Sequence, residues 1–240
     1  MKKILLILIV ITLLFPKQAR AQNNTATAIA ATVATAGLIT AAILSSEDMK
    51  ERAELRATQW VLANHPEFTT FNLETFDFNG KKAKDMSTTT VISFKIQEFT
   101  PVMNPKLDGK KYVLFCFTSY GWISDQGMDF SKVNWYLIDG EEWLKMMVTY
   151  TKVSSEEKDE KVLKETLLAG VIENKGIKVK GKMVIPFYKL DGDSYLVTDY
   201  SSDMKFVYNE KSLCIFLKKT GDLVQMRRQT IIDTHLFFFP

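Results

Sequence analysis

Few side chains in this sequence are of the types that usually carry out chemistry. The 240 residues contain two histidines, His65 and His235, and two cysteines, Cys116 and Cys214. These counts exclude a metal centre built on several histidines and a zinc site built on four cysteines. Each histidine is expected to be a surface or helix-capping residue, because a catalytic base needs an oriented partner.

One stretch resembles a hydrolase signature and then departs from it. Gly192-Asp193-Ser194 resembles the nucleophile block of GDSL-type hydrolases, and Asp233-Thr234-His235 resembles their carboxy-terminal Asp-x-x-His. However, Tyr195 stands where leucine should follow the serine, and the Asp-His spacing is one residue short. A nucleophilic serine must also meet its base geometrically, and this serine lies beside a predicted turn. We therefore expect no catalytic residues.

Aspartates also cluster in this region, which raises the question of calcium. An EF-hand loop that began at Asp191 would need glycine where Leu196 stands, so that motif is excluded. No glycine-rich phosphate loop or dinucleotide fingerprint is present. The sequence therefore predicts neither a cofactor nor a metal.

The stretch from Met183 to Thr198 predicts a β-hairpin. Two β-prone arms flank Asp191-Gly192, a pair typical of a two-residue type I′ turn. With that turn, Tyr188 should lie directly opposite Tyr195.

Two further stretches share the pattern of this hairpin. They are Lys106–Val113 and Leu137–Leu144, each with Asp-Gly before two polar residues and an aromatic. The second is ambiguous, because Asp139 and Glu142 have the spacing of a helix capping box. We favour the strand, which would place Tyr136 opposite Trp143, because residues 148–151 are β-prone.

Two helices are expected to accompany the strands. Residues 47–66 form an amphipathic charged helix, with Met49, Ala53, Ala57 and Trp60 on one stripe and Pro66 at its end. A second helix should run from about residue 155 to Gly170. The remainder of residues 67–240 is β-rich, and residues 112–120 are apolar on both faces, as in a central strand.

The fold class is therefore α+β. We expect a twisted antiparallel sheet or partly closed barrel of about eight to ten strands, covered by one or two helices. Lys178, Lys180 and Lys182 are read as protection of an edge strand, and a binding stripe is the alternative. The apolar tail, residues 236–239, should pack as a last strand or dock on a partner.

Residues 1–21 are expected to be a secretory signal peptide that is cleaved after Ala21. Lys2 and Lys3 precede an apolar run, and Ala19-Arg20-Ala21 has the small-x-small pattern of a cleavage site. Residues 1–21 hold four of the 31 basic residues and no acid, which leaves 27 basic residues against 28 acidic ones. This near balance argues against a nucleic-acid binder.

Residues 22–46 contain no charge and are rich in alanine and threonine. The segment is expected to be helical, and it either packs on a domain or partner, inserts in a membrane or oligomerises, or serves as a tether. Its apolar side chains are candidate interaction residues: Ile29, Val33, Ile39, Ile43 and Leu44.

Two further features leave alternatives open. Trp122 lies in a loop, where it either contacts a ligand or folds back over the core. Cys116 and Cys214 lie in apolar runs, and export permits a disulfide between them, although two buried thiols are the simpler interpretation.

These observations favour an exported periplasmic or outer-surface protein of the cell envelope that is not an enzyme. It is expected to act by association with an envelope protein or another copy of itself through residues 22–46, with membrane contact left open. The alternative is a periplasmic carrier that encloses an apolar small molecule within its β domain.

Overall fold

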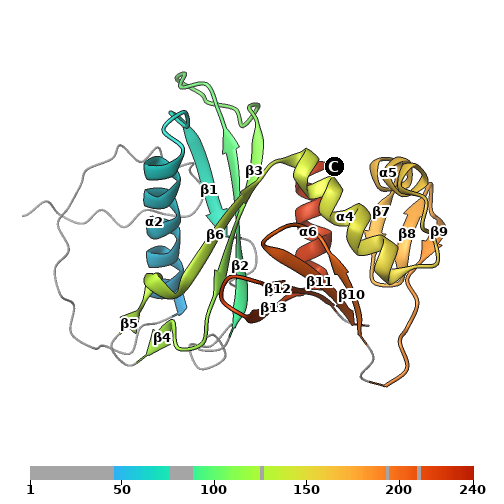
Figure 1. Cartoon of the computed structure of the whole chain (residues 1–240). Coiled ribbons are helices and arrows are strands. Elements are labelled where there is room, and N and C mark those ends of the chain that lie inside the picture. Colours follow the sequence, from blue (N-terminus) through green and yellow to red (C-terminus); the bar gives the residue numbers. More distant parts are fainter. Residues whose placement is uncertain (1–45, 76–88, 125–126, 193–194, 210–211) are drawn as a thin grey trace, which may run out of the picture.

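The computed structural model in Figure 1 describes residues 46–75, 89–124, 127–192, 195–209 and 212–240. In this part of the chain the fold is α+β, with helices packed around several antiparallel sheets. The helices are α2 (Ser46–Asn64), α4 (Gly140–Ser154), α5 (Glu160–Ala169) and α6 (Arg228–Phe238), with a 3-10 turn η1 (Phe130–Lys132). The strands are β1 (Phe71–Thr75), β2 (Thr90–Glu98), β3 (Lys111–Thr118), β4 (Ile123–Ser124), β5 (Gly127–Met128), β6 (Val133–Ile138), β7 (Val171–Glu173), β8 (Gly176–Val179), β9 (Lys182–Pro186), β10 (Leu196–Asp199), β11 (Met204–Asn209), β12 (Ser212–Leu217) and β13 (Asp222–Arg227).

The first sheet has the order β1-β2-β3-β6, and β3 is one of its two central strands. Every residue from Val113 to Phe117 is at most 1% exposed. Leu114 and Cys116 pack into one core, whereas Phe115 and Phe117 pack into another. Residues 112–120 thus include a strand covered on both faces, which is what their continuous apolar character predicts.

Helix α2 covers one face of the first sheet (Figure 1). Met49, Ala53, Ala57 and Val61 follow each other at four-residue spacing and are all at most 2% exposed. The half-buried Trp60 stacks on Trp135 of β6, with the ring centroids 6.0 Å apart. Together with residues from β2 and β3, this stripe forms the smaller of the two cores.

The larger core lies on the other face of the first sheet. There α4 and α6 pack together with a second sheet of order β10-β11-β12-β13 and a small sheet of order β7-β8-β9 (Figure 1). Ser119 Oγ donates a hydrogen bond to Asp222 Oδ2 at 2.5 Å, and Thr89 Oγ1 donates one to Leu223 O at 3.0 Å. These two bonds join an end of the first sheet to β13.

The hairpin predicted for residues 183–198 is wrong. Strand β9 pairs with β8, and β10 pairs with β11, so Asp191-Gly192 lies in the connection between two sheets. Tyr188 does not face Tyr195, and its hydroxyl instead donates to Val153 O at 2.5 Å. Each of the two arms pairs with a strand from elsewhere in the chain. In the small sheet, this pairing buries Ile185 beside Ile177.

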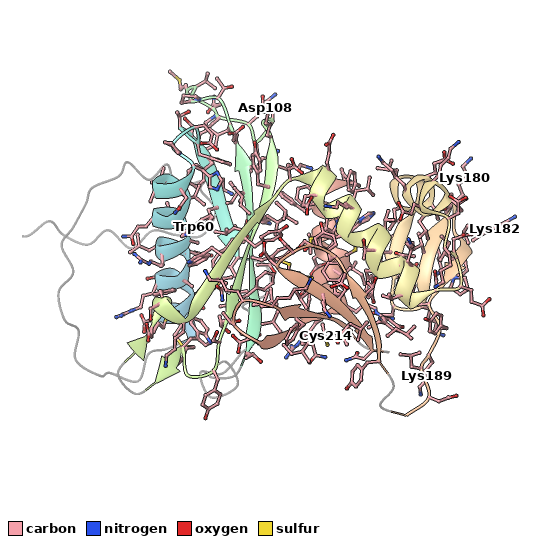
Figure 2. All side chains as sticks on the ribbon, in the orientation of Figure 1. Trp60, Asp108, Lys180, Lys182, Lys189 and Cys214 are labelled. Carbon is pink, nitrogen blue, oxygen red and sulfur yellow. The ribbon has the colours of Figure 1, made fainter. Side chains whose placement is uncertain are left out.

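A two-residue hairpin turn occurs instead at Lys180-Gly181. Val179 pairs with Lys182, and the two turn residues have φ values of +51° and +77°. Both values are positive, as a type I′ turn requires. Lys180 therefore lies in the turn, and Lys178 and Lys182 lie on different strands, so the three lysines are not one face of one strand. Figure 2 shows Lys180 and Lys182 at the far end of the small sheet.

The strand favoured after Gly140 is also wrong, because residues 140–154 form helix α4. Asp139 caps this helix by accepting a hydrogen bond from Glu142 N at 2.9 Å. Trp143, Met147 and Tyr150 are then buried on one side of the helix. Burial of three large side chains in the larger core outweighs the modest β-propensity of residues 148–151.

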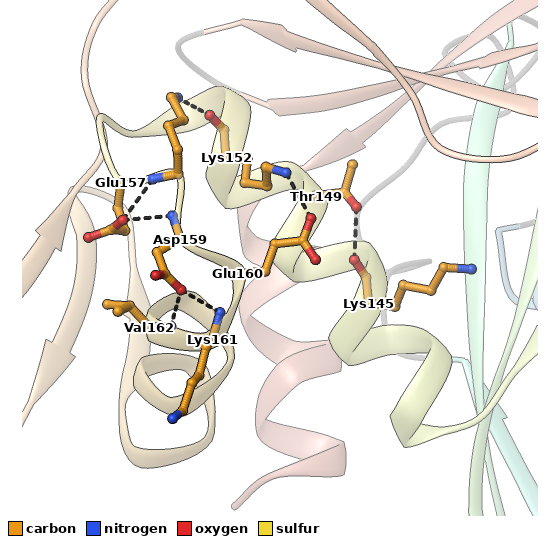
Figure 3. A network of polar contacts seen from close by, with 9 residues as sticks. Lys145, Thr149, Lys152, Glu157, Asp159, Glu160, Lys161 and Val162 are labelled. Carbon is orange, nitrogen blue, oxygen red and sulfur yellow. Dashed lines mark hydrogen bonds and ion pairs between the residues drawn. The ribbon is translucent and has the colours of Figure 1, made fainter.

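Helix α5 begins later than its sequence predicts. Asp159 is its N-cap, accepting from Lys161 N at 2.8 Å and Val162 N at 3.2 Å (Figure 3). The preceding residues connect α4 to α5, and Lys152 Nζ donates to Glu160 Oε1 across this connection at 2.8 Å. Figure 3 shows these contacts on the surface of the α4–α5 pair, where they order the connection.

Of the two expected architectures, the partly closed barrel does not form, because the described strands build separate open antiparallel sheets. The tail is also not a strand, since residues up to Phe238 belong to helix α6. Phe237, Phe238 and Phe239 are partly buried against the larger core.

Candidate functional site

The candidate interaction residues from the sequence have different outcomes. Ile29, Val33, Ile39, Ile43 and Leu44 lie outside the described residues, as does the expected signal peptide. Trp122 is fully buried, so an exposed contact at this position is wrong. Its ring packs edge-on against Phe130, and its carbonyl accepts from Asp129 N at 2.7 Å. The β4-β5 ribbon folds this loop back over the smaller core.

Cys116 in the first sheet and Cys214 in the second are both buried, and they are not joined by a disulfide. Burial raises the pKa of the Cys214 thiol. Since the thiolate is the reactive form, a buried thiol with a raised pKa is chemically inert. The structure therefore agrees with the simpler interpretation, in which the two cysteines are buried thiols and not a disulfide.

His235 is buried, which makes its expected place on the surface wrong. Trp143 Nε1 donates to His235 Nδ1 at 3.2 Å, and His235 Nε2 lies 3.0 Å from Leu167 O. This pattern requires a neutral ring with its proton on Nε2. The ring thereby joins α4, α5 and α6. The sequence does not indicate that His235 contacts Trp143 or the aromatic tail, because only the packing of the helices brings these side chains together.

Within the described residues, no group of three or more histidine, cysteine, aspartate or glutamate side chains could hold a metal ion. In the same part of the chain, none of the helices has both the length and the apolar character of a membrane span.

A polar cluster surrounds Glu142 at the start of α4. Tyr136 OH donates to its Oε1 at 3.1 Å, Tyr200 OH donates to the same oxygen, and Lys145 Nζ lies 3.7 Å from Oε2. Tyr200 also stacks on Phe206, with ring centroids 4.5 Å apart. The cluster therefore joins β6 and α4 to the second sheet.

This cluster is poorly suited to acid-base or nucleophilic catalysis. Burial, followed by the nearby Glu142 carboxylate, raises the pKa of Tyr136 to about 12 and also raises the pKa of Tyr200. The two phenols therefore keep their protons near neutral pH, and both oxygens of Glu142 are occupied. The geometry supports a structural tie between sheets.

The most exposed apolar group of the described residues lies on the loop between β2 and β3. We call residues 99–110 the apolar loop. Val102 is 58% exposed, Met103 97% and Leu107 45%. Figure 1 shows this loop projecting past the end of the first sheet, and Figure 2 labels Asp108 on the side of the loop that leads into β3. Water-exposed apolar side chains gathered on one projection are typical of an interaction site.

The base of the apolar loop is held by hydrogen bonds. Gly109 N donates to Glu98 O at 3.0 Å, and Glu98 N donates to Lys110 O at 3.0 Å. Further out, Gln97 Nε2 donates to Leu107 O at 2.7 Å. A Cβ at Gly109 would lie 2.6 Å from Glu98 O, so this position requires glycine. The pair Asp108-Gly109 thus lies in a longer loop and does not form a two-residue turn.

Two prolines further restrict the apolar loop. Pro101 and Pro105 stand on either side of Val102 and Met103. Proline fixes φ near −65° and restricts the residue before it. The exposed side chains are therefore presented from a backbone with little conformational freedom.

Comparison with family models, curated proteins and solved structures finds no match to this chain.

Proposed function

We propose that this chain is an exported cell-envelope protein that works by association, and that the apolar loop is a docking surface of residues 46–240. The observation that carries the proposal is the exposure of Val102, Met103 and Leu107 on a loop whose base is fixed by hydrogen bonds. A loop that merely connected two strands would gain nothing from three exposed apolar side chains, which lower solubility.

The partner proposed for the apolar loop is a protein and not a lipid surface. The loop carries the acid Asp108 as well as Lys106 and Lys110, all exposed. Insertion of the whole loop into a bilayer would require the Asp108 carboxylate to be dehydrated, which is costly. A protein partner could instead receive Met103 in a pocket and leave both charge signs at a polar rim. The restriction by Pro101 and Pro105 lowers the entropy lost on docking.

Residues 22–46 complete the proposal as a second association segment. An uncharged helix rich in small residues can approach another helix closely, whether of a partner or of a second copy. Deletion of residues 22–46 should change the sedimentation of the protein and its membrane fractionation. If the number of chains per particle and the location are unchanged, this segment has no part in association.

Site-specific photocrosslinking in the producing cell tests the docking surface. A photoreactive amino acid at Met103 should give a discrete protein adduct, because this side chain is the most exposed apolar group on the loop. Val102→Glu in the same chain should reduce that adduct, since a charge at the contact would have to be buried.

Tyr120 provides the matched control position. It is 77% exposed and follows β3, whereas the apolar loop precedes β3, so the two sites lie about 25 Å apart. Equal adducts at both positions would contradict the proposal, and so would adducts with lipid alone at Met103.

The carrier of an apolar small molecule receives less support. That alternative depended on a barrel able to enclose a ligand, and the described strands form open sheets around side chains that are themselves buried.

A further inference from the structure

The second sheet ends in an edge strand whose backbone is available for pairing. Strand β10 pairs with β11 on one side only. Tyr200 N donates to Met204 O at 3.2 Å, so this pair is a hydrogen-bonded one. Because hydrogen-bonded pairs alternate along an antiparallel ladder, Thr198 and Leu196 also bond to β11. The N–H and C=O groups of Val197 and Asp199 therefore point away from the sheet.

The bond pattern of the neighbouring ladder agrees with this assignment. Lys218 N donates to Asp203 O at 2.9 Å, so residues 205, 207 and 209 of β11 bond to β12. The intervening residues, Phe206 and Tyr208, must then bond to β10. Among the described residues, none bonds to the outward backbone groups of Val197 or Asp199.

Strand β10 lacks the lysine, the proline and the irregular pairing that protect the edge of the small sheet. The edge strand of the small sheet, β9, begins with Lys182, ends with Pro186 and pairs irregularly beside Lys178. Lysine, proline and irregular pairing all discourage edge-to-edge association. Strand β10 reads Leu-Val-Thr-Asp, has none of these features, and leaves Val197 59% exposed.

We propose that a second copy of this chain pairs with β10, antiparallel and across a two-fold axis at Val197. Val197 then lies opposite Val197 of the second copy as a hydrogen-bonded pair, and Tyr195 lies opposite Asp199. The two four-stranded sheets become one continuous sheet of eight strands. This goes beyond the proposed function, because it assigns a self-association site that involves neither the apolar loop nor residues 22–46.

The sequence of the edge selects this register. The two-fold axis can pass through a hydrogen-bonded pair, at Val197 or Asp199, or through a non-hydrogen-bonded pair, at Leu196 or Thr198. An axis at Leu196 or Thr198 would place Val197 opposite Tyr195 or Asp199 instead of a second Val197. An axis at Asp199 would place two carboxylates opposite each other, which is destabilising. An axis at Val197 instead pairs two exposed apolar side chains.

Disulfide trapping tests the register directly in the full chain. The Cα atoms of a hydrogen-bonded antiparallel pair lie about 5.5 Å apart, within the range that a disulfide spans. Val197→Cys should therefore form a covalent dimer under mild oxidation. Asp199→Cys is the matched control, because its side chain is also exposed but the two copies of residue 199 would lie about 13 Å apart.

The expected result is a disulfide-linked dimer for Val197→Cys and none for Asp199→Cys. Cys116 and Cys214 are present in both variants and are buried, so they contribute equally. Absence of the Val197→Cys dimer, or equal dimer from both variants, overturns the proposal.

A second variant tests the backbone bonds. Val197→Pro removes the outward N–H while leaving the ladder with β11 intact, because that N–H does not bond to β11. In sedimentation equilibrium over a concentration series, it should raise the dissociation constant of the dimer about tenfold or more.

Leu223→Lys is the control for this measurement, because Leu223 is 47% exposed on the same sheet but lies on β13, away from the paired edge. It should leave the dissociation constant unchanged. An unchanged constant for Val197→Pro, or an equal loss for Leu223→Lys, would show that β10 pairing is not the contact.

Discussion

His235 illustrates how a single side chain can connect three helices. Its ring accepts from Trp143 of α4 and lies within hydrogen-bond distance of Leu167 O in α5, while its own backbone belongs to α6. Burial lowers the pKa of His235. A protonated ring would turn Nδ1 into a donor facing the Trp143 donor, so the contact exists only with the neutral ring.

The free energy of unfolding should therefore fall as the pH drops below the ordinary histidine pKa of about 6.5. Below that pH the unfolded chain binds a proton at His235 before the folded chain does, so acid favours unfolding until the pH reaches the lowered pKa of the folded state. Above about pH 7, both states hold the neutral ring and this contribution is constant.

Urea unfolding at pH 7 and pH 5.5 measures this dependence. His235→Gln should be less stable than the wild type at pH 7, and its stability should change less between the two pH values. The matched variant His65→Gln leaves the contacts of His235 in place and should keep the wild-type fall. If the free energy of unfolding of His235→Gln falls between pH 7 and pH 5.5 as much as that of the wild type, this account is contradicted.

At the scale of elements, the turn at Lys180-Gly181 is a local strain that the fold tolerates. Among the described residues other than glycine, Lys180 is the one with a positive φ. In this left-handed backbone region a residue with a Cβ is disfavoured by roughly 1–2 kcal/mol. The small sheet nonetheless forms there, because Ile177 and Ile185 beside the turn are buried.

Lys180→Asn should stabilise the protein by about 0.5 kcal/mol or more, since asparagine tolerates this backbone region and favours type I′ turns. Thermal unfolding followed by circular dichroism would show the gain as a higher midpoint. Lys182→Asn is the control, because Lys182 lies in extended backbone, and it should bring no gain. A lower midpoint for Lys180→Asn would show that the lysine side chain itself stabilises the turn.

At the scale of the molecule, the described residues form two cores that share one sheet. Strand β3 contributes Leu114 to the smaller core with α2 and Phe115 to the larger core with the second sheet. Adjacent residues of one strand thus belong to different cores. Loss of either core should expose one face of the same sheet, so the two are expected to unfold together.

Leu114→Ala and Leu213→Ala test this coupling, because both leucines are fully buried but belong to different cores. Each variant should lower the free energy of unfolding by about 2–5 kcal/mol, through lost burial and the cavity that remains. In both, tryptophan fluorescence and far-ultraviolet circular dichroism should report one coincident transition. Two separate transitions in either variant would mean that the cores unfold independently.

Features set by local chemistry were predictable from the sequence. The stripe of Met49, Ala53 and Ala57 specifies the buried face of α2, and Pro66 limits its length. The continuous apolar run of β3 specifies burial on both faces. The class α+β follows from such patterns, because period and turn chemistry act over a few residues.

Strand partners and the identity of exposed surfaces depended on the tertiary structure. Asp139-Gly140 and Asp191-Gly192 share one dipeptide, yet the first begins a helix and the second lies between sheets, because distant packing surfaces select among locally allowed backbones. The exposure of Met103, the burial of Trp122 and His235, and the open edge of β10 have the same origin. Each results from which segments far apart in the sequence come together, and no local pattern encodes that.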